Sequence, residues 1–316
     1  MNKIWDVYVY GDVNIDLVVP GVEALPEPGT EVDVGQMETF VGGGAALFTL
    51  GLAKLGVRTA FQGSVGRDMY GSYIRSLFRS LNIDDGLLQD SAEKKTGISI
   101  SFTNEKDRCF LTYRGTNEGL SLSRMDLTQL VKARHVHITG YEGATNHDEY
   151  LNVIRRIHEI GDVSVSFDVG WDMTGAWYKG IFDLLPFIDV LFMNETECLH
   201  YTRCDDVLTG ARLLDQYAKM AVIKLGSKGS LAVRDGQVFR AGSYRVQAVD
   251  TTGAGDSFNA GFIYAYLNGY PIDVSLRCAN ACGALSVTAL GGNTAFPRLD
   301  ELNAFMNEQK EGEPAL

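Results

Sequence analysis

Short runs of apolar and β-branched residues alternate along the chain with segments whose apolar residues recur at helical spacing. The first pattern is typical of buried β-strands and the second of amphipathic helices. Strands are expected at Trp5–Gly11, Thr59–Gly63, His135–Thr139, Val163–Asp168, Asp189–Met193 and Ala221–Leu225, and helices at about 44–55, 68–81, 147–160, 178–185 and 205–218. Strands that alternate with helices form βαβ units, so the pattern predicts an α/β fold, a three-layer α/β/α sandwich around a mostly parallel sheet.

Two stretches, about 15–40 and 96–114, contain paired β-like runs with no helix between them. The runs are Ile15–Val19, Val32–Phe40, Gly97–Thr103 and Cys109–Tyr113, and the turn Asn104–Asp107 separates the last two as in a hairpin. We expect a small antiparallel sheet that projects from one domain spanning residues 1–316 and serves as a lid or as a homodimer surface. The alternative is an extension at the edge of the main sheet.

Composition narrows the class of protein. The 316 residues include 28 Lys and Arg against 40 Asp and Glu, a net charge of −12 that argues against nucleic acid or an anionic membrane as the main partner. No apolar stretch is long enough to span a membrane, and no secretory signal is visible at the start. Five cysteines without a dense pattern do not indicate disulfides or a zinc site, and a cytoplasmic protein is expected.

The most informative segment is the run DTTGAGD at 250–256, which leads directly into an apolar helical pattern. Gly253 and Gly255 lack side chains, and Ala254 has a small one, so the backbone N–H groups of this turn can approach an anion closely. The first turn of a helix also has N–H groups without helical partners and the positive end of the helix dipole. We therefore expect Gly253–Asp256 to form an anion hole for a phosphoryl group in transfer.

Asp256 stands in that first turn, beside the expected phosphoryl position. Phosphoryl transfer to an alcohol needs a base near the hydroxyl as its proton departs, and a carboxylate suffices for this. The alternative interpretation is that Asp256 only stabilises the helix N-terminus.

The run DTTGAGDSFNAGF resembles the C-terminal signature of the ribokinase-like (PfkB) family of carbohydrate kinases, and further segments resemble other family motifs in the same order. No Walker A loop and no GxGxxG fingerprint is present. The resemblance implies a ribokinase-like fold and ATP-dependent phosphorylation of a hydroxyl on a small sugar-like acceptor, with Asp256 as the base. It implies ATP and Mg²⁺ as cofactors.

Several residues acquire expected roles from this resemblance. Asn194 and Glu197 match the family's NxxE element, which organises magnesium and phosphate, although a helix N-cap explains the same residues. The run KLGSKG at 224–229 resembles the family's ATP loop, with Lys224 where the family has Thr. The nucleotide-binding set implied is Asn194, Glu197, Lys224, Gly226, Ser227, Gly229 and Asn280. Many family members also bind a monovalent cation such as K⁺, and its ligand positions here are Asp250, Thr252, Ser286, Ala289, Gly291 and Ala295.

The acceptor side is implied by the N-terminal motifs. Asp16 matches the family's hydroxyl-binding Asp, and Asn14 lies on the same strand face two residues earlier. The glycine turn at Gly42 and Gly43 leads to Leu47, where the family usually has an Asn that contacts the sugar. Either the acceptor has an apolar edge at that point, or another residue supplies the polar contact. Arg114 and Glu142 are further candidates, and an Arg in this place can hold a carboxylate or phosphate.

Three other functions remain as alternatives. A nucleoside kinase of the same family differs only in its acceptor. A non-catalytic sensor of sugars or nucleotides finds support in Leu47 but not in the intact GAGD run. A nicotinamide dehydrogenase would need the glycine fingerprint that the sequence lacks.

Overall fold

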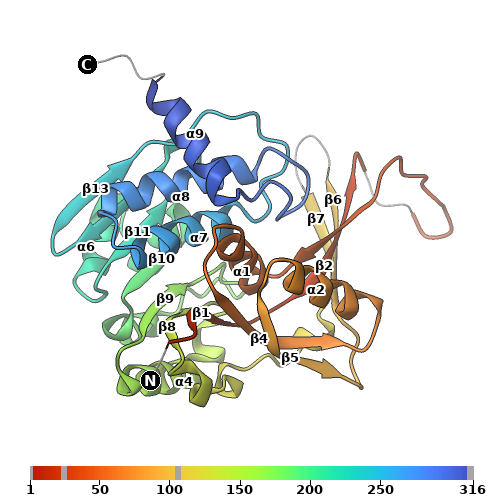
Figure 1. The fold of residues 1–316 in the computed structure, drawn as a ribbon, viewed down its shortest axis with the longest axis horizontal. Helices are drawn as coiled ribbons and strands as arrows, with labels where there is room; N and C mark the ends of the chain where they lie inside the picture. Colours follow the sequence, from red (N-terminus) through yellow and green to blue (C-terminus); the bar gives the residue numbers. More distant parts are fainter. Residues whose placement is uncertain (1–2, 23–26, 104–107, 312–316) are drawn as a thin grey trace.

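A large sheet runs through the centre of the molecule. The computed structural model describes residues 3–22, 27–103 and 108–311. Within these ranges the strands of the large sheet lie in the order β13-β12-β11-β10-β9-β8-β1-β4-β5 (Figure 1). Their bounds are β1 (Trp5–Tyr10), β4 (Thr59–Gly66), β5 (Asp84–Ser91), β8 (Ala133–Ile138), β9 (Ser164–Asp168), β10 (Val190–Asn194), β11 (Ala221–Lys224), β12 (Ser230–Arg234) and β13 (Gln237–Ala241). All pairs from β11 to β5 are parallel, whereas β12 and β13 are antiparallel at one edge.

Helices cover both faces of this sheet, as the alternating pattern predicts. One face packs against α1 (Gly44–Lys54), α2 (Met69–Ser80), α7 (Ala254–Leu267) and α8 (Ile272–Ser286) in one apolar cluster. The other face packs against α3 (Leu127–Leu130), α4 (His147–Ile160), α5 (Glu195–Thr202) and α6 (Val207–Asp215). The last helix, α9 (Leu299–Glu311), lies on α8. The predicted three-layer α/β/α fold is thus confirmed.

One expected helix has a different form. In place of the α-helix predicted at 178–185, the structure has the 3₁₀ helix η4 (Lys179–Asp183), followed by a second, η5 (Leu185–Phe187). Gly180 is a weak helix former, and Pro186 has no N–H with which to continue an α-helix. The apolar residues that suggested a helix are still buried, because Ile181, Leu184 and Leu185 belong to the core.

A separate small sheet projects to one side of the large sheet (Figure 1). It consists of β2 (Asn14–Pro20), β3 (Glu38–Gly42), β6 (Gly97–Thr103) and β7 (Arg108–Tyr113) in the order β3-β2-β6-β7. The expectation of a purely antiparallel sheet is wrong, because β2 and β6 are parallel. The chain passes through β4, α2 and β5 between these two strands and returns in the same direction. Residues 32–37, predicted as strand, lie outside β3, and the predicted turn at 104–107 lies outside the described residues.

The topology determines where a site can form. The carboxyl ends of parallel strands meet at one edge of the sheet, and ligands of open α/β sheets bind beyond that edge. Here β1, β8, β9, β10 and β11 end together, and β2 and β3 of the small sheet join the first of them to α1. In the part of the chain that the structure describes, no helix is long and apolar enough to cross a membrane.

Candidate active site

The predicted anion hole lies at the N-terminus of α7. Gly253 caps this helix with a φ of 73°, a left-handed conformation that favours glycine. A side chain at Gly253 would also overlap the carbonyl oxygen of Gly292. Ala254, Gly255 and Asp256 form the first turn, so the structure brings all four predicted residues to one helix N-terminus.

Asp256 lies where two helices begin. A Cβ atom on Gly44, the first residue of α1, would be only 3.6 Å from Asp256 Oδ1. Burial raises the pKa of Asp256 well above its usual value, and nearby Asp168 and Asp12 raise it further, while Lys224 lowers it. A carboxylate with raised proton affinity beside a helix N-terminus has the properties of a general base.

A cavity of about 630 Å³ opens between this end of the large sheet and the small sheet. It brings together four of the residues predicted for the acceptor side, namely Asn14, Asp16, Arg114 and Glu142. Arg114 Nη1 lies 3.7 Å from Glu142 Oε1, and both side chains are more than half exposed. Asp12 and Gly44 also line the cavity, so it reaches the start of α1 and the vicinity of Asp256.

Asp16 is a half-buried carboxylate of this cavity. Burial raises its pKa to about 6, Asp12 and Asp250 raise it as well, and a hydrogen bond donated by Asn14 opposes them. The Asn14 Nδ2 to Asp16 Oδ1 distance is 2.7 Å, so Asn14 orients the carboxylate. Asp16 can accept hydrogen bonds from hydroxyl groups of an acceptor.

The two predicted glycines, Gly42 and Gly43, do not line the cavity but make room for the residues that do. A side chain on Gly42 would overlap the carboxylate of Asp16. Gly43 has a φ of 95°, and its Cβ would come within 2.8 Å of the Asp12 carbonyl oxygen. The glycine turn therefore lets α1 begin directly against the end of β1 and the start of β2.

Asp12 is a residue of the site to which no role was assigned from the sequence. Its carboxylate accepts hydrogen bonds from the backbone N–H groups of Gly44 at 3.0 Å and Ala45 at 3.1 Å. It thus stabilises the N-terminus of α1 from a distant position in the chain. The only signal in the sequence is an acidic residue directly after a buried strand, which does not show which helix it contacts.

Leu47 lies away from the acceptor cavity. Its side chain is 4% exposed and belongs to the apolar cluster between the sheet and α7. A Cβ atom on Gly292 would be 3.3 Å from one of its methyl groups. Leu47 is not among the described residues that line the cavity, so its position gives no support to the expected contact with an acceptor.

A second cavity, of about 820 Å³, lies on the other side of the α7 N-terminus. Among the residues that line it are Lys224, Gly226, Ser227, Gly229 and Asn280, all predicted to bind the nucleotide, together with Ala254 and Gly255 of the anion hole. Asn280 donates to the carbonyl oxygens of Ala241 and Gly242 at 3.2 and 3.0 Å and so ties α8 to the end of β13. Gly255 separates the anion hole from Lys224, since a Cβ atom there would lie 3.4 Å from the Lys224 Nζ.

Asn194 and Glu197 form a capping box at the start of α5. Asn194 N donates to Glu197 Oε2 at 2.7 Å, and Glu197 N donates to Asn194 Oδ1 at 2.8 Å. Burial raises the pKa of Glu197 to about 7, Asp168 contributes in the same direction, and Lys224 opposes both. The capping interpretation is therefore correct, yet it leaves a buried carboxylate close to the nucleotide cavity.

Hydrogen bonds connect three of the residues predicted for a monovalent cation, namely Asp250, Thr252 and Gly291. Asp250 Oδ1 accepts from Thr252 N at 2.9 Å and from Thr252 Oγ1 at 2.8 Å, while Asp250 Oδ2 accepts from Gly291 N at 2.9 Å. Ser286, at the end of α8, donates its hydroxyl to the Gly283 carbonyl at 2.8 Å. Ala289 and Ala295 lie between α8 and α9.

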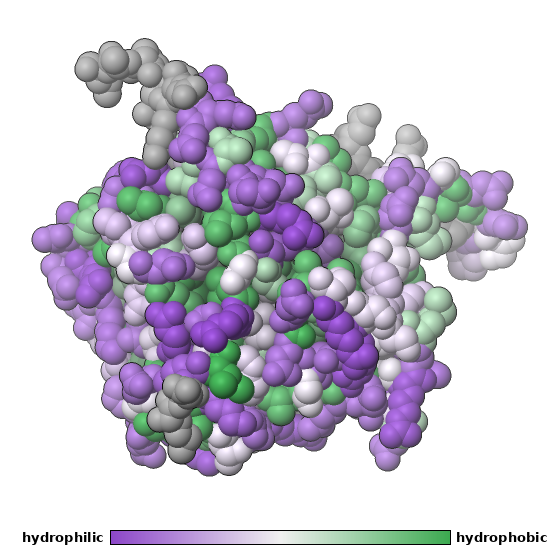
Figure 2. All heavy atoms as spheres, in the orientation of Figure 1, coloured by the Kyte–Doolittle hydropathy of each residue, from purple (hydrophilic) through white to green (hydrophobic). Residues whose placement is uncertain are grey.

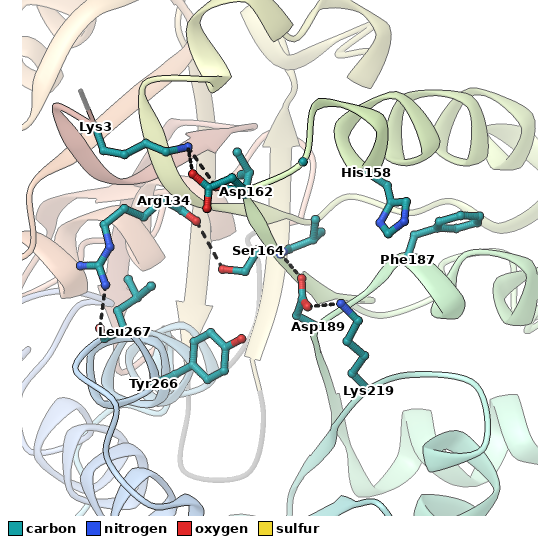
Figure 3. Close-up of a pocket in the computed structure, with 13 residues that line it drawn as sticks. Lys3, Arg134, His158, Asp162, Ser164, Phe187, Asp189, Lys219, Tyr266 and Leu267 are labelled. Atoms are coloured by element: carbon teal, nitrogen blue, oxygen red, sulfur yellow. Dashed lines mark hydrogen bonds and ion pairs between the residues drawn. The ribbon is translucent and has the colours of Figure 1, made fainter. Parts of the chain in front are cut away.

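A further cavity, of about 810 Å³, lies at the opposite edge of the sheet (Figure 3). Its lysines already have partners: Lys3 Nζ donates to the carbonyl oxygens of Ala133 and Asp162, and Lys219 Nζ lies 2.7 Å from Asp189 Oδ1. None of the predicted site residues lines it.

Comparison with known proteins places the chain among kinases. The chain is 26% identical over 320 residues to a 5-dehydro-2-deoxygluconokinase of Listeria innocua serovar 6a, covering 94% of this chain and 97% of that protein. It is 31% identical over 300 residues to an ATP-dependent ribose-1-phosphate kinase of Halopiger xanaduensis, covering 95% and 97%. Among solved structures, Arabidopsis thaliana ribokinase complexed with ribose and ATP matches with a TM-score of 0.82 and 25% identity, over 97% of this chain and 99% of that one.

The fold and these relatives indicate an ATP-dependent sugar kinase. A family model described as pfkB family carbohydrate kinase matches residues 6–299. The chain belongs to the pfkB family of carbohydrate kinases.

Proposed function

We propose that the protein phosphorylates a hydroxyl of a sugar that carries a carboxylate or phosphate group. In this proposal Arg114 binds the anionic group, Asn14 and Asp16 bind hydroxyls, and Asp256 takes the proton of the attacking hydroxyl. We favour a kinase over the sensor alternative because Gly253 and Asp256 both lie at the N-terminus of α7, where the proposal needs them.

The observation that carries the proposal is the exposed guanidinium of Arg114 in the acceptor cavity. Among the described residues that line it, Arg114 is the one Lys or Arg, while Asp12, Asp16 and Glu142 are acidic. Arg114 is 66% exposed and makes only a loose ion pair with Glu142, so its guanidinium is available to a ligand. A guanidinium binds a carboxylate or phosphate through two parallel hydrogen bonds.

The names of the relatives support the same class of acceptor. The Halopiger relative is named for a sugar phosphate and the Listeria relative for a deoxygluconate derivative, which is a sugar acid. Aromatic side chains in the cavity, Phe110 and Tyr113 from β7, also suit the base of a nucleoside, which is the second candidate acceptor.

The proposed step moves one phosphoryl group. The acceptor oxygen forms a bond to the γ-phosphorus of ATP while the bond to the β,γ-bridging oxygen breaks, and ADP leaves. The hydroxyl proton passes to the Asp256 carboxylate. Backbone N–H groups of Gly253–Asp256 stabilise the charge on the transferred group.

The residues also fit a magnesium ion that accompanies the nucleotide. Mg²⁺ is usually held by one or two carboxylates and substrate phosphates rather than by a protein cage. In the described ranges no cluster of three or more His, Cys, Asp or Glu side chains suits a metal, whereas Glu197 offers one buried carboxylate near the nucleotide cavity. A bound Mg²⁺ would neutralise phosphate charge, and Glu197, which accepts a hydrogen bond from the Asn194 backbone N–H, would supply a carboxylate for it. A monovalent cation such as K⁺ would bind at the loops that Asp250 connects.

The small sheet is the proposed surface of a homodimer. β7 is an edge strand with Leu111 53% and Tyr113 52% exposed, and Val32 and Met37 are exposed in the segment that precedes β3. Figure 2 shows hydrophobic side chains on the projecting part of the molecule at the right of the view. An exposed edge strand with apolar side chains is suited to pairing with a second copy.

The proposed compartment is the cytoplasm, in keeping with the absence of disulfides among the described residues.

The proposal is tested by an acceptor panel. Sugar acids, sugar phosphates, neutral sugars and nucleosides are assayed with MgATP, and an anionic sugar is expected to give the highest kcat/KM. Arg114→Ala should lower kcat/KM for that acceptor by about 10- to 100-fold, the value of a hydrogen bond to a charged group, and leave the KM for ATP unchanged.

Arg156→Ala is the matched control, because Arg156 is an exposed arginine on α4. It should have no effect on either substrate. Equal use of neutral and anionic sugars by the wild type, or no change in Arg114→Ala, would contradict the anionic acceptor. A preference for nucleosides would select the second candidate.

A further inference from the structure

Three polar side chains from three elements meet beneath the anion hole. Lys224, at the end of β11, places its Nζ 2.8 Å from Asp168 Oδ2 at the end of β9. Asn259 of α7 donates its Nδ2 to the same oxygen, and its Oδ1 lies 3.4 Å from the Lys224 Nζ. Asn259 is fully buried and Asp168 nearly so, which makes this a built arrangement rather than a surface contact.

The path of the Lys224 side chain shows that it is directed. β10 lies between β9 and β11, with Phe192 opposite Asp168 and Asn194 opposite Lys224. The lysine therefore extends across a whole strand to reach Asp168 and is 16% exposed along the way. A long flexible side chain adopts such a path only where specific contacts hold it, because its rotamer entropy opposes it.

The ammonium group of Lys224 faces the anion hole. It lines the nucleotide cavity, and a methyl group on Gly255 would meet its Nζ at 3.4 Å. A lysine ammonium has three N–H donors. Asp168 and Asn259 account for two of them, and the third is left for an oxygen at the Gly255 turn, where the transferred phosphoryl group would lie.

Lys224 is also the charge partner of Asp168. His137 is a second basic group near Asp168, but burial lowers its pKa to about 3, and its Nδ1 is 2.7 Å from the Ser166 hydroxyl. A neutral imidazole does not balance a carboxylate. Burial alone would raise the pKa of Asp168, but the charge of Lys224 holds it below its usual value.

We propose that Lys224 is a catalytic residue that stabilises the charge developing on the transferred phosphoryl group, and that Asp168 and Asn259 are positioning residues that hold its ammonium at the anion hole. The inference rests on the proposed function only in placing that phosphoryl group at Gly253–Asp256. Lys224 moves no proton and forms no covalent bond. Its contribution is a fixed positive charge, which accelerates the reaction only if it acts more strongly in the transition state than on bound ATP.

Lys224→Met tests the first part, because methionine keeps the length of the side chain and removes the charge. We expect kcat to fall by about 10²–10³, as for other preorganised donors, while the KM for ATP stays within about threefold. A raised KM for ATP with unchanged kcat would overturn the proposal, because Lys224 would then bind ATP in the ground state only. Lys219→Met is the matched control, because it removes a lysine paired with Asp189 at the opposite edge of the sheet (Figure 3).

A double-mutant cycle tests the positioning role. Asp168→Asn should lower kcat, but combining it with Lys224→Met should reduce kcat no further than Lys224→Met alone. If the two substitutions instead lower kcat by factors that multiply in the double variant, Asp168 does not act through Lys224. The double variant also removes both charges of the pair, so that no single charge is left buried.

Asn259→Ala is the second positioning variant, for use if Asp168→Asn alone does not fold. It removes one hydrogen bond to each partner and should lower kcat by about tenfold in the wild-type background and not at all with Lys224→Met. A fall of the same size in both backgrounds would overturn the role of Asn259.

The pH dependence of kcat supplies a readout that a purely structural role would not change. Asp256 is faced by Asp168 of β9 and Asp12 after β1, which raise its pKa, and by Lys224 of β11, which lowers it. Lys224→Met should therefore move the acidic limb of the kcat profile to higher pH, and Asp168→Asn should move it to lower pH. Shifts of the acidic limb in the same direction in both variants would contradict the proposed placement of Lys224 and Asp168.

Full turnover in Asp256→Asn would instead contradict the proposed function. The double-mutant cycle of Lys224 and Asp168 would still test the role of Lys224 in that case.

Discussion

The phosphoryl side and the acceptor side of the site are built differently, as one ion pair from each side shows. The phosphoryl side has Lys224–Asp168, and the acceptor side has Arg114–Glu142. The first spans 2.8 Å with side chains 16% and 12% exposed, and the second spans 3.7 Å with side chains 66% and 53% exposed. Exposed pairs contribute about 0–1 kcal/mol, whereas removing one partner of a buried pair costs about 3–5 kcal/mol. The phosphoryl side is thus rigid and preorganised. On the acceptor side, a ligand can replace Glu142 as the partner of Arg114 with little loss of free energy.

The same contrast extends to the elements that supply the residues. The phosphoryl side is formed by strand ends of the large sheet and by the first turn of α7, which has core contacts along its length. Arg114 follows β7, at the edge of the projecting small sheet. We expect the phosphoryl side, which is rigid, to perform the chemistry shared by a family. We expect the acceptor side to select one acceptor.

The largest effect is expected at the phosphoryl side, from Asp256→Asn. The amide has the same shape and can still stabilise a helix N-terminus, so the fold and the binding of ATP should be kept. Turnover should fall by about 10²–10⁴, the usual range for a lost general base. Initial rates together with ATP-induced shifts in Tm measure both properties. Near-normal turnover by a folded variant would remove Asp256 from the mechanism.

Gly255→Val comes next, because it fills the space between the anion hole and Lys224. A single Cβ lies at an ordinary 3.4 Å from the Lys224 Nζ, so Gly255→Ala should be mild, but the further methyl groups of valine must displace the lysine or the phosphoryl group. We expect kcat to fall by about 10²–10³. Gly35→Val, at an exposed glycine with no neighbouring atoms, is the control. Equal kinetics for the two valine variants would show that this turn does not hold phosphate.

Gly42→Ala tests the acceptor side with a smaller expected effect. The new methyl group would overlap the Asp16 carboxylate and force it to move. The kcat/KM for the acceptor should fall by about tenfold, the value of one displaced hydrogen bond to a charged group, with no change in the KM for ATP. Gly35→Ala is again the control. A change in the KM for ATP equal to that for the acceptor would mean that the two sides are not independent.

The last prediction concerns the effect of Asp16→Asn on stability, which is the smallest effect expected here. Burial raises the pKa of Asp16 from 3.8 to about 6, so its ionised form opposes folding, and this cost appears as the pH rises through that range. The asparagine variant should therefore gain about 2–4 °C in Tm over the wild type at pH 8 and nothing at pH 4. Scanning fluorimetry across that range measures it. A gain that is the same at every pH would exclude burial of the charge as its cause.

Local patterns in the sequence predicted much of this molecule. Glycines before a helical run, as at Gly253, indicate an anion hole because short-range geometry alone creates one. The pattern did not reveal β5, which has three Asp residues within its bounds and lies at the edge of the sheet, where exposed polar side chains are tolerated. Nor did it indicate the parallel pairing of β2 with β6, because pairing direction depends on the route of the chain between the strands.

The sequence by itself determined the fold class and the phosphoryl-transfer motif, because both depend on periodicity and on residue types that are close together in the chain. Only the tertiary structure decided the partners that come from distant segments. In the structure Asp12 accepts a hydrogen bond from the start of α1, and Leu47 lies in the core rather than in the acceptor cavity. Lys224 extends across β10 and contacts Asp168. Such contacts are selected by how strands align and helices pack, and no local pattern records them.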